Sequence, residues 1–159
     1  MQRVPSKRLD ERATKVWQIG GIIHSAFSCF IAAGLTVLTV IFDLPWYLPA
    51  IAIAIAVLYS TYFVLIYPRL RWSRWRYDIH EHEIELMYGV IFITRTIIPM
   101  VRVQHVDTMQ GPLLRRYDLA TITFSTAAGN HEIPALALDT ADGARERIAE
   151  LARVSREDV

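Results

Sequence analysis

Two long runs of uncharged, mostly apolar residues occupy the first half of the chain. Residues 17–42 form a run of 26 residues, and residues 44–67 form a second run of 24. A helix of about 20 apolar residues already crosses the hydrocarbon core of a bilayer. Part of the second run alternates as IAIAIA, but its length overrules a strand. The pattern therefore predicts two transmembrane helices.

The connection between the two runs is very short. Asp43, Leu44 and Pro45 leave room only for a tight turn, so the helices should form an antiparallel hairpin. Asp43 suits the N-cap of the second helix and Pro45 its first turn. Small residues at helical spacing predict close packing within the hairpin, or alternatively a contact between copies in a homo-oligomer. They are Gly21, Ser25, Ser28, Ala32, Ala52 and Ala56.

The stretch RLRWSRWRYD, residues 69–78, follows the second run directly and carries four arginines and three large aromatic residues. It fits a nucleic-acid patch, a membrane-surface anchor or the opening strand of a folded domain. Its place after the span puts the arginines beside anionic headgroups and the tryptophans in an aromatic belt. The predicted membrane-interface or lipid-contacting residues are Arg69, Arg71, Trp72, Arg74, Trp75 and Arg76.

From Trp75 onward, apolar and polar residues alternate in short segments. The alternation predicts strands over residues 75–79, 84–88, 90–98, 101–106, 119–127 and 131–136. The segment 107–118 reads as a loop, and Gly129 and Asn130 as a hairpin turn. After Asp139 or Thr140, which should cap it, the period becomes that of an amphipathic helix.

These elements predict an α+β chain in three parts. Residues 1–16 form a basic N-terminal tail, residues 17–68 a transmembrane helical hairpin, and residues 69–159 a folded domain of antiparallel strands closed by a C-terminal helix. Eight apolar side chains should share the core of that domain. They are Trp75, Tyr77, Ile84, Leu86, Ile122, Phe124, Ile148 and Leu151.

Charge adds an orientation and excludes one class of partner. Five Lys and Arg precede the first span, four Arg follow the second within ten residues, and the turn has none. The positive-inside rule then places both termini in the cytoplasm of a multi-pass inner-membrane protein. The net charge is only +1, which argues against a nucleic-acid binder. Cys29 is the only cysteine, so no intramolecular disulfide forms.

Candidate chemistry is sparse. His80, Glu81, His82 and Glu83 form a polar turn, and His105 and His131 are the nearest further metal ligands along the sequence. The spacing matches no metal-binding or catalytic motif, and no phosphate-binding loop or nucleophile elbow is present. We therefore expect no catalytic residue, no metal site and no cofactor.

The segments RWRYDIHEHEIELMYGVI, TRTIIPMVRVQHVDTMQGPLLRRYDLATITFSTAAG and IPALALDTADGARERIAEL resemble the bacterial pleckstrin-homology-like domain of the YdbS-like membrane proteins. Two N-terminal helices ahead of one such domain also fit that family. Asp118 stands where the family pattern has glycine, and Asp tolerates the left-handed backbone of such a turn. The motif positions are Arg102, Gln104, Gly111, Pro112, Leu113, Arg115, Thr126, Ala127 and Gly129.

The resemblance implies a bent antiparallel sheet of about seven strands capped by a C-terminal helix, in a fold that mostly hosts binding. Two functions follow as expectations. The first is a non-catalytic scaffold or accessory subunit for another membrane protein, such as one with similar domains. The alternative is binding of anionic lipid headgroups. From Arg69 onward, 12 Arg face 13 Asp and Glu, and this balance favours the scaffold.

Overall fold

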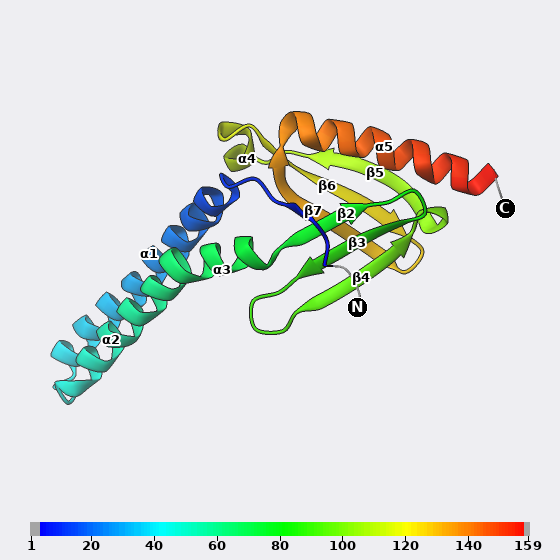
Figure 1. Ribbon diagram of the computed structural model, residues 1–159. Helices are drawn as coiled ribbons and strands as arrows, with labels where there is room; N and C mark the ends of the chain where they lie inside the picture. Colours follow the sequence, from blue (N-terminus) through cyan, green and yellow to red (C-terminus); the bar gives the residue numbers. More distant parts are fainter. Residues whose placement is uncertain (1–3, 158–159) are drawn as a thin grey trace. The chain divides into compact units, whose positions relative to one another are not determined.

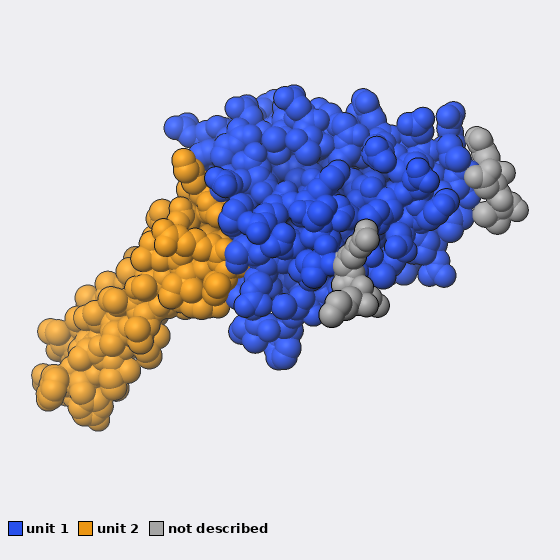
Figure 2. Space-filling model, in the orientation of Figure 1, with its two compact units in different colours: residues 1–13, 71–159 blue, residues 14–70 orange. Residues whose placement is uncertain are grey.

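The computed structural model describes residues 4–157 and divides into two compact units (Figures 1 and 2). Residues 14–70 form a helical unit, coloured orange in Figure 2. The described residues up to Ala13, together with those from Arg71 onward, form a sheet unit. The segment 4–13, which the sequence suggested is a tail, is therefore built into the folded domain.

The helical unit consists of two long helical segments. The first is α1 (Ala13–Ile41), and the second runs without a break through α2 (Tyr47–Thr61), the π-helical turn η1 (Tyr62–Ile66) and α3 (Tyr67–Arg74). Both segments are long and apolar enough to cross a membrane, with 29 and 28 residues. The second segment extends seven residues past the predicted span, to Arg74. Most of the basic stretch 69–78 is therefore helical, although the opening strand of a folded domain was one of the structures considered for it.

Small residues bring the two segments of the helical unit together. Gly21 lies so close to Phe63 that a Cβ atom would collide with the Phe63 carbonyl group, which belongs to the π-helical turn η1. Ala32 and Ala56, from opposite segments, are each only 6% exposed. The predicted packing by small residues is thus present within the hairpin.

The turn between the segments differs from the prediction. Asp43 has a φ of 50°, and the Leu44 amide donates to the Thr39 carbonyl oxygen at 3.0 Å. This is a left-handed C-terminal cap, so Asp43 ends α1 and does not start the next helix. The second helix begins at Tyr47 with Trp46 in the N-cap position, and no side chain caps it.

Sheet A has four antiparallel strands in the order β1-β2-β3-β4. They are β1 (Lys7–Arg8), β2 (Arg76–Ile79), β3 (Glu83–Tyr88) and β4 (Thr94–Pro99). Because β1 pairs with β2, the whole helical hairpin is an insertion between two neighbouring strands of one sheet. Both ends of the hairpin therefore connect to the same folded unit.

The strand predicted over 90–98 starts four residues late, at Thr94. Gly89 has a φ of +120°, and a Cβ atom there would collide with the Phe92 carbonyl group. The chain thus turns sharply after β3, and residues 90–93 form an irregular loop before β4. Local alternation does not reveal this turn because Val90, Ile91, Phe92 and Ile93 are all apolar.

Sheet B has three antiparallel strands in the order β5-β6-β7. They are β5 (Val103–Met109), β6 (Leu119–Thr126) and β7 (Gly129–Ala137). The 3-10 turn η2 (Met100–Arg102) joins the two sheets, and the short helix α4 (Pro112–Arg116) occupies the predicted loop. The β6–β7 turn lies at Ala127 and Ala128, two residues before the predicted position.

Helix α5 (Leu138–Glu157) packs along β5 and η2 and also contacts β6 and β7. It starts at Leu138, so Asp139 lies in its first turn and is not the cap. Of the eight predicted core residues, seven are at most 5% exposed, with Phe124, Ile84, Ile122 and Ile148 at 0%, and Leu151 is half-buried. The α+β architecture with seven strands and a closing helix is confirmed.

Candidate functional site

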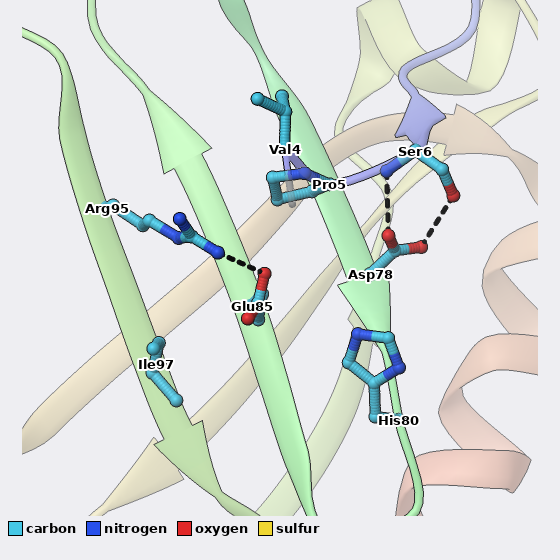
Figure 3. Close-up of a pocket in the computed structure, with 8 residues that line it drawn as sticks. All are labelled: Val4, Pro5, Ser6, Asp78, His80, Glu85, Arg95 and Ile97. Carbon is cyan, nitrogen blue, oxygen red and sulfur yellow. Dashed lines mark hydrogen bonds and ion pairs between the residues drawn. The ribbon is translucent and has the colours of Figure 1, made fainter. Parts of the chain in front are cut away.

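A hollow of about 530 Å³ lies on the outer face of sheet A (Figure 3). It combines apolar, acidic and basic side chains from three strands with the N-terminal segment that precedes β1. Its lining residues are Val4, Pro5, Ser6, Asp78, His80, Glu85, Arg95 and Ile97.

Strand alternation explains which residues reach this face. Asp78 pairs with Glu85 and Glu85 with Ile97, so one residue from each of three strands stands in a single row. Their neighbours in sequence point into the core, where burial raises the pKa of the Tyr77 phenol and keeps it neutral. The hollow is therefore the solvent face of a sheet whose other face is fully packed.

Most charged groups of the hollow are paired with other residues that line it. The Arg95 guanidinium donates to the Glu85 carboxylate at 3.0 Å, and this carboxylate side chain is only 13% exposed. Asp78 accepts two hydrogen bonds from Ser6, from the amide at 2.7 Å and the hydroxyl at 3.0 Å. Two carboxylates thus face one guanidinium, which leaves the hollow without a net positive charge to bind an anion.

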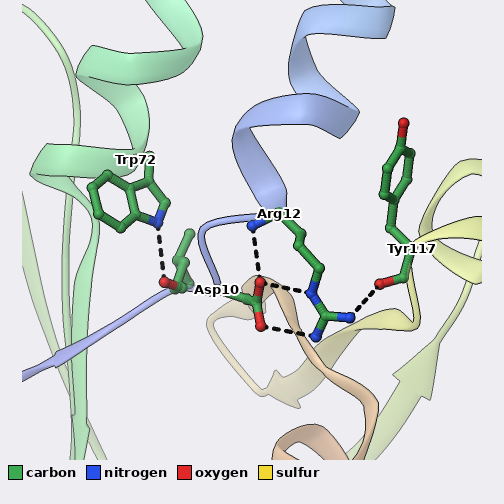
Figure 4. A network of polar contacts seen from close by, with 5 residues as sticks. Asp10, Arg12, Trp72 and Tyr117 are labelled. Carbon is green, nitrogen blue, oxygen red and sulfur yellow. Dashed lines mark hydrogen bonds and ion pairs between the residues drawn. The ribbon is translucent and has the colours of Figure 1, made fainter.

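A second polar network ties the N-terminal segment to the loop after α4 (Figure 4). Arg12 donates to both carboxylate oxygens of Asp10 at 3.0 Å and to the Tyr117 carbonyl oxygen at 2.9 Å. The hydrogen bond from the Arg12 side chain is the main cause that lowers the pKa of Asp10. The network holds residues 10–12, directly before α1, against the loop that follows α4.

Trp72 is a third attachment point for the N-terminal segment. Its indole nitrogen donates to the Leu9 carbonyl oxygen at 3.0 Å, and the Arg8 guanidinium lies 5.8 Å from its ring centre. Trp75 is only 5% exposed and stacks on Tyr88 with 5.6 Å between ring centres, so it is a core residue, as its strand position predicted. Arg69, Arg71 and Arg74 belong to α3, and Arg76 opens β2.

The family-motif positions fall into two groups at different places on sheet B. Around η2 and the β6–β7 turn lies a hollow of about 520 Å³. It is lined by Val101, Arg102, Val103, Gln104, Ala127 and Ala128. The Thr126 hydroxyl stabilises this turn by donating to the Gly129 carbonyl oxygen at 3.0 Å. The structure thus unites Arg102, Gln104, Thr126, Ala127 and Gly129.

The other motif positions surround α4 at the opposite end of β5 and β6. Gly111 precedes the helix and its carbonyl oxygen accepts the Arg115 amide at 2.9 Å, while Pro112 occupies the first turn. Leu113 is 36% exposed, and Arg115 is exposed. Asp118, which follows, has the predicted left-handed backbone with a φ of 51°.

The polar turn His80–Glu83 does not assemble a metal centre. With Arg147 it lines an open hollow, whereas His105 lies on β5 and His131 stacks on Phe124. Across residues 4–157, no group of three or more His, Cys, Asp or Glu is arranged to hold a metal ion.

Sequence reasoning missed the contribution of the N-terminal segment to the site. Pro5 and Leu9 are buried, and the two-residue strand β1 is too short to show a period. The only local signal is a single apolar residue, Leu9, between charged neighbours.

Comparison with known proteins agrees with this architecture. The Bacterial PH domain family matches residues 30–152 of the chain. The UPF0699 transmembrane protein YdbS of Bacillus subtilis (strain 168) is 45% identical over 159 residues, which covers all of both chains. No solved structure shows significant similarity. The chain is a membrane protein that belongs to the bacterial PH domain family.

Proposed function

We propose that the chain is a non-catalytic, membrane-anchored scaffold or accessory subunit whose sheet unit docks another membrane protein. The observation that carries this proposal is the hollow on the outer face of sheet A, whose lining combines apolar, acidic and basic side chains beside an edge strand. A segment of another protein fits such a surface better than a phosphate group does.

The edge supplies backbone groups for docking. Strand β4 lies at the edge of sheet A, and among the described strands it pairs only with β3. Ile97 on this strand is 48% exposed and lines the hollow. An exposed edge strand is a template for an added strand, with side-chain pockets supplying specificity. The partner segment would pair with β4 and place an apolar side chain, or a cation facing Asp78 and Glu85, in the hollow.

The insertion of the hairpin supports a docking surface on one side of the membrane. The segments before and after the two spans belong to one folded unit, because β1 and β2 pair with each other, and this supports placing both segments on the same side of the membrane. The basic residues that flank the spans favour the cytoplasmic side for both termini.

Binding of anionic lipid headgroups is the second candidate, and the exposed Arg69 and Arg74 on α3 favour it. These arginines lie next to the second span, where topology alone accounts for positive charge. None of the three hollows on the sheet unit described above gathers two or more guanidinium groups in its lining. The scaffold remains the preferred function.

The test is photo-crosslinking of the full chain in the membrane of a bacterium that encodes it, with a photoreactive residue at position 97. We expect an adduct of one defined protein mass, reduced by Glu85→Gln. The control position is Glu132, exposed on β7. Equal adducts at both positions would contradict the docking site, and an adduct with acidic phospholipid at position 97 would favour the alternative.

A further inference from the structure

The loop between β3 and β4 exposes three large apolar side chains in succession. Ile91 is 80% exposed, Phe92 85% and Ile93 54%. We call residues 90–93 the apolar tip. It contains no charged residue, and the nearest one along β4, Arg95, is paired with Glu85. Scattered single apolar residues are normal on protein surfaces, but a contiguous exposed cluster marks an interaction site.

The tip has a defined conformation at its base. Gly89 adopts a φ of +120°, and the chain closes so tightly that a Cβ atom would collide with the Phe92 carbonyl group. Tyr88, the last residue of β3, stacks on the buried Trp75 and pairs with Thr94 across the hairpin. The contacts at the base of the loop therefore fix the position from which the apolar side chains project.

Strand register places the tip at the end of sheet A where the chain arrives from the second span. Arg76, the first residue of β2, pairs with Met87, and the tip begins three residues after Met87. The helix ends at Arg74, two residues before β2. The tip and the exit from the span thus share one end of the sheet.

Distances along the chain put the bilayer within reach. Trp75 follows Tyr67, the last residue of the apolar run, by eight residues, which in a helix is about 12 Å. The tip extends two to three residues past Trp75, or about 7–10 Å. The polar layer of a bilayer is about 5–8 Å thick on each side. These lengths are sufficient for the tip to reach the boundary between headgroups and acyl chains.

The sheet unit is attached to the spans by short connections. The second span passes into α3 without a break, and Trp72 on α3 bonds to Leu9 of the N-terminal segment. On the other side, Arg12 binds the Tyr117 carbonyl oxygen directly before α1 begins at Ala13. Both spans are therefore joined to the sheet unit through only a few residues.

We propose that the apolar tip, and Phe92 in particular, inserts into the bilayer on the side where the sheet unit lies, as a third membrane attachment besides the two spans. The occupant is lipid because the tip is uncharged, lies at the end of sheet A where the chain enters β2 from the second span, and is carried by a transmembrane protein. This attachment would orient the hollow of sheet A relative to the membrane, and it is independent of the scaffold role.

The test uses the full chain with Cys29→Ala, so that a new cysteine is the only one. Phe92→Cys is labelled with an environment-sensitive fluorophore, and the protein is placed in lipid nanodiscs that contain phosphatidylglycerol and phosphatidylcholine. Lipids with a nitroxide near the headgroup should quench the label, and its emission should shift to shorter wavelength. Val101→Cys, at the opposite end of β4 and 42% exposed, is the matched control and should show neither effect.

A second variant excludes insertion by the label itself. With the label at Ile91→Cys, adding Phe92→Asp should abolish the quenching without changing thermal unfolding, because the Phe92 side chain is 85% exposed. Equal quenching at positions 92 and 101, or water-like emission at 92, would overturn the proposal. Protection of position 92 in native membranes but not in nanodiscs would also overturn it, and would assign the tip to a protein partner.

Discussion

The helical unit and the sheet unit use apolar residues in opposite ways. In the helical unit, Phe30 is 77% exposed and Leu58 is 71% exposed, while the residues at the contact are Gly21, Ala32 and Ala56. In the sheet unit, Phe124, Ile84 and Ile122 are fully buried. Large apolar side chains lie where water is absent. For the helical unit this is the surrounding lipid, and for the sheet unit it is the protein interior.

The comparison also separates two kinds of stabilisation. Burial of large side chains stabilises the sheet unit because it removes their apolar surface from water. Between membrane helices no such force acts, so close backbone approach through small residues has to supply the attraction. A change in side-chain volume should therefore act in opposite ways on the stability of the two units. Removing atoms from the core destabilises the sheet unit, and adding atoms at the helix contact destabilises the hairpin.

The largest effect is expected for Phe124→Ala in the sheet unit. Phe124 is 0% exposed, and truncating a buried Phe to Ala costs about 3–5 kcal/mol of unfolding free energy. Hydrogen exchange of the sheet amides in the full chain measures it. The control is Phe92→Ala at an exposed position, which should change this free energy by less than about 0.5 kcal/mol. Equal losses for both variants would show that the core is not where the structure places it.

A smaller effect is expected for Gly21→Ala in the helical unit. The added methyl group meets the Phe63 carbonyl, and overpacking of this kind costs about 1–3 kcal/mol. Gly20→Ala, one residue away, meets no atom within 4 Å and should be neutral or stabilising. Unfolding of the hairpin in detergent measures both variants. Unchanged stability of the hairpin in Gly21→Ala would contradict the close approach of the two segments.

A still smaller, pH-dependent effect is expected for Arg12→Gln. Because the pKa of Asp10 is lowered in the folded state, its contribution to stability is complete above its ordinary pKa of 3.8 and is lost as the pH falls through the lowered value. The variant should unfold at a lower temperature than the parent at neutral pH, and the difference should narrow in acid; the part that remains there reflects the lost hydrogen bond to the Tyr117 carbonyl oxygen. Arg153→Gln, on the exposed side of α5, serves as control. A difference that stays the same from neutral pH into acid would show that pairing with Asp10 contributes nothing to it.

The smallest effect is expected when Arg71, Arg74 and Arg76 are all replaced by Lys. A positive anchor needs only charge near the interface, whereas a specific phosphate site needs the planar fork of Arg for paired hydrogen bonds. We expect the same lipid classes to remain bound to parent and variant, as measured by mass spectrometry of the full chain after detergent exchange. Selective loss of one anionic headgroup would promote lipid recognition above the scaffold.

Several features could be predicted from the sequence because their causes are local. Uncharged runs of 26 and 24 residues predict two membrane spans, and period-two alternation predicts that Tyr77, Ile84 and Phe124 lie in a core. Asp118 was predicted to take a left-handed backbone, and it does. The order of elements and the resemblance on the motif residues were sufficient to identify the family.

Other features depend on contacts between residues far apart in the chain, which no local period encodes. The pairing of Lys7 with Tyr77 makes the hairpin an insertion within a sheet, and the bonds from Ser6 to Asp78 complete the hollow. The apolar tip escaped prediction because a strand and an exposed loop of four apolar residues look alike until the surrounding packing is known. A sequence determines which side chains avoid water, and only the tertiary structure decides whether neighbouring protein covers each of them or leaves it exposed.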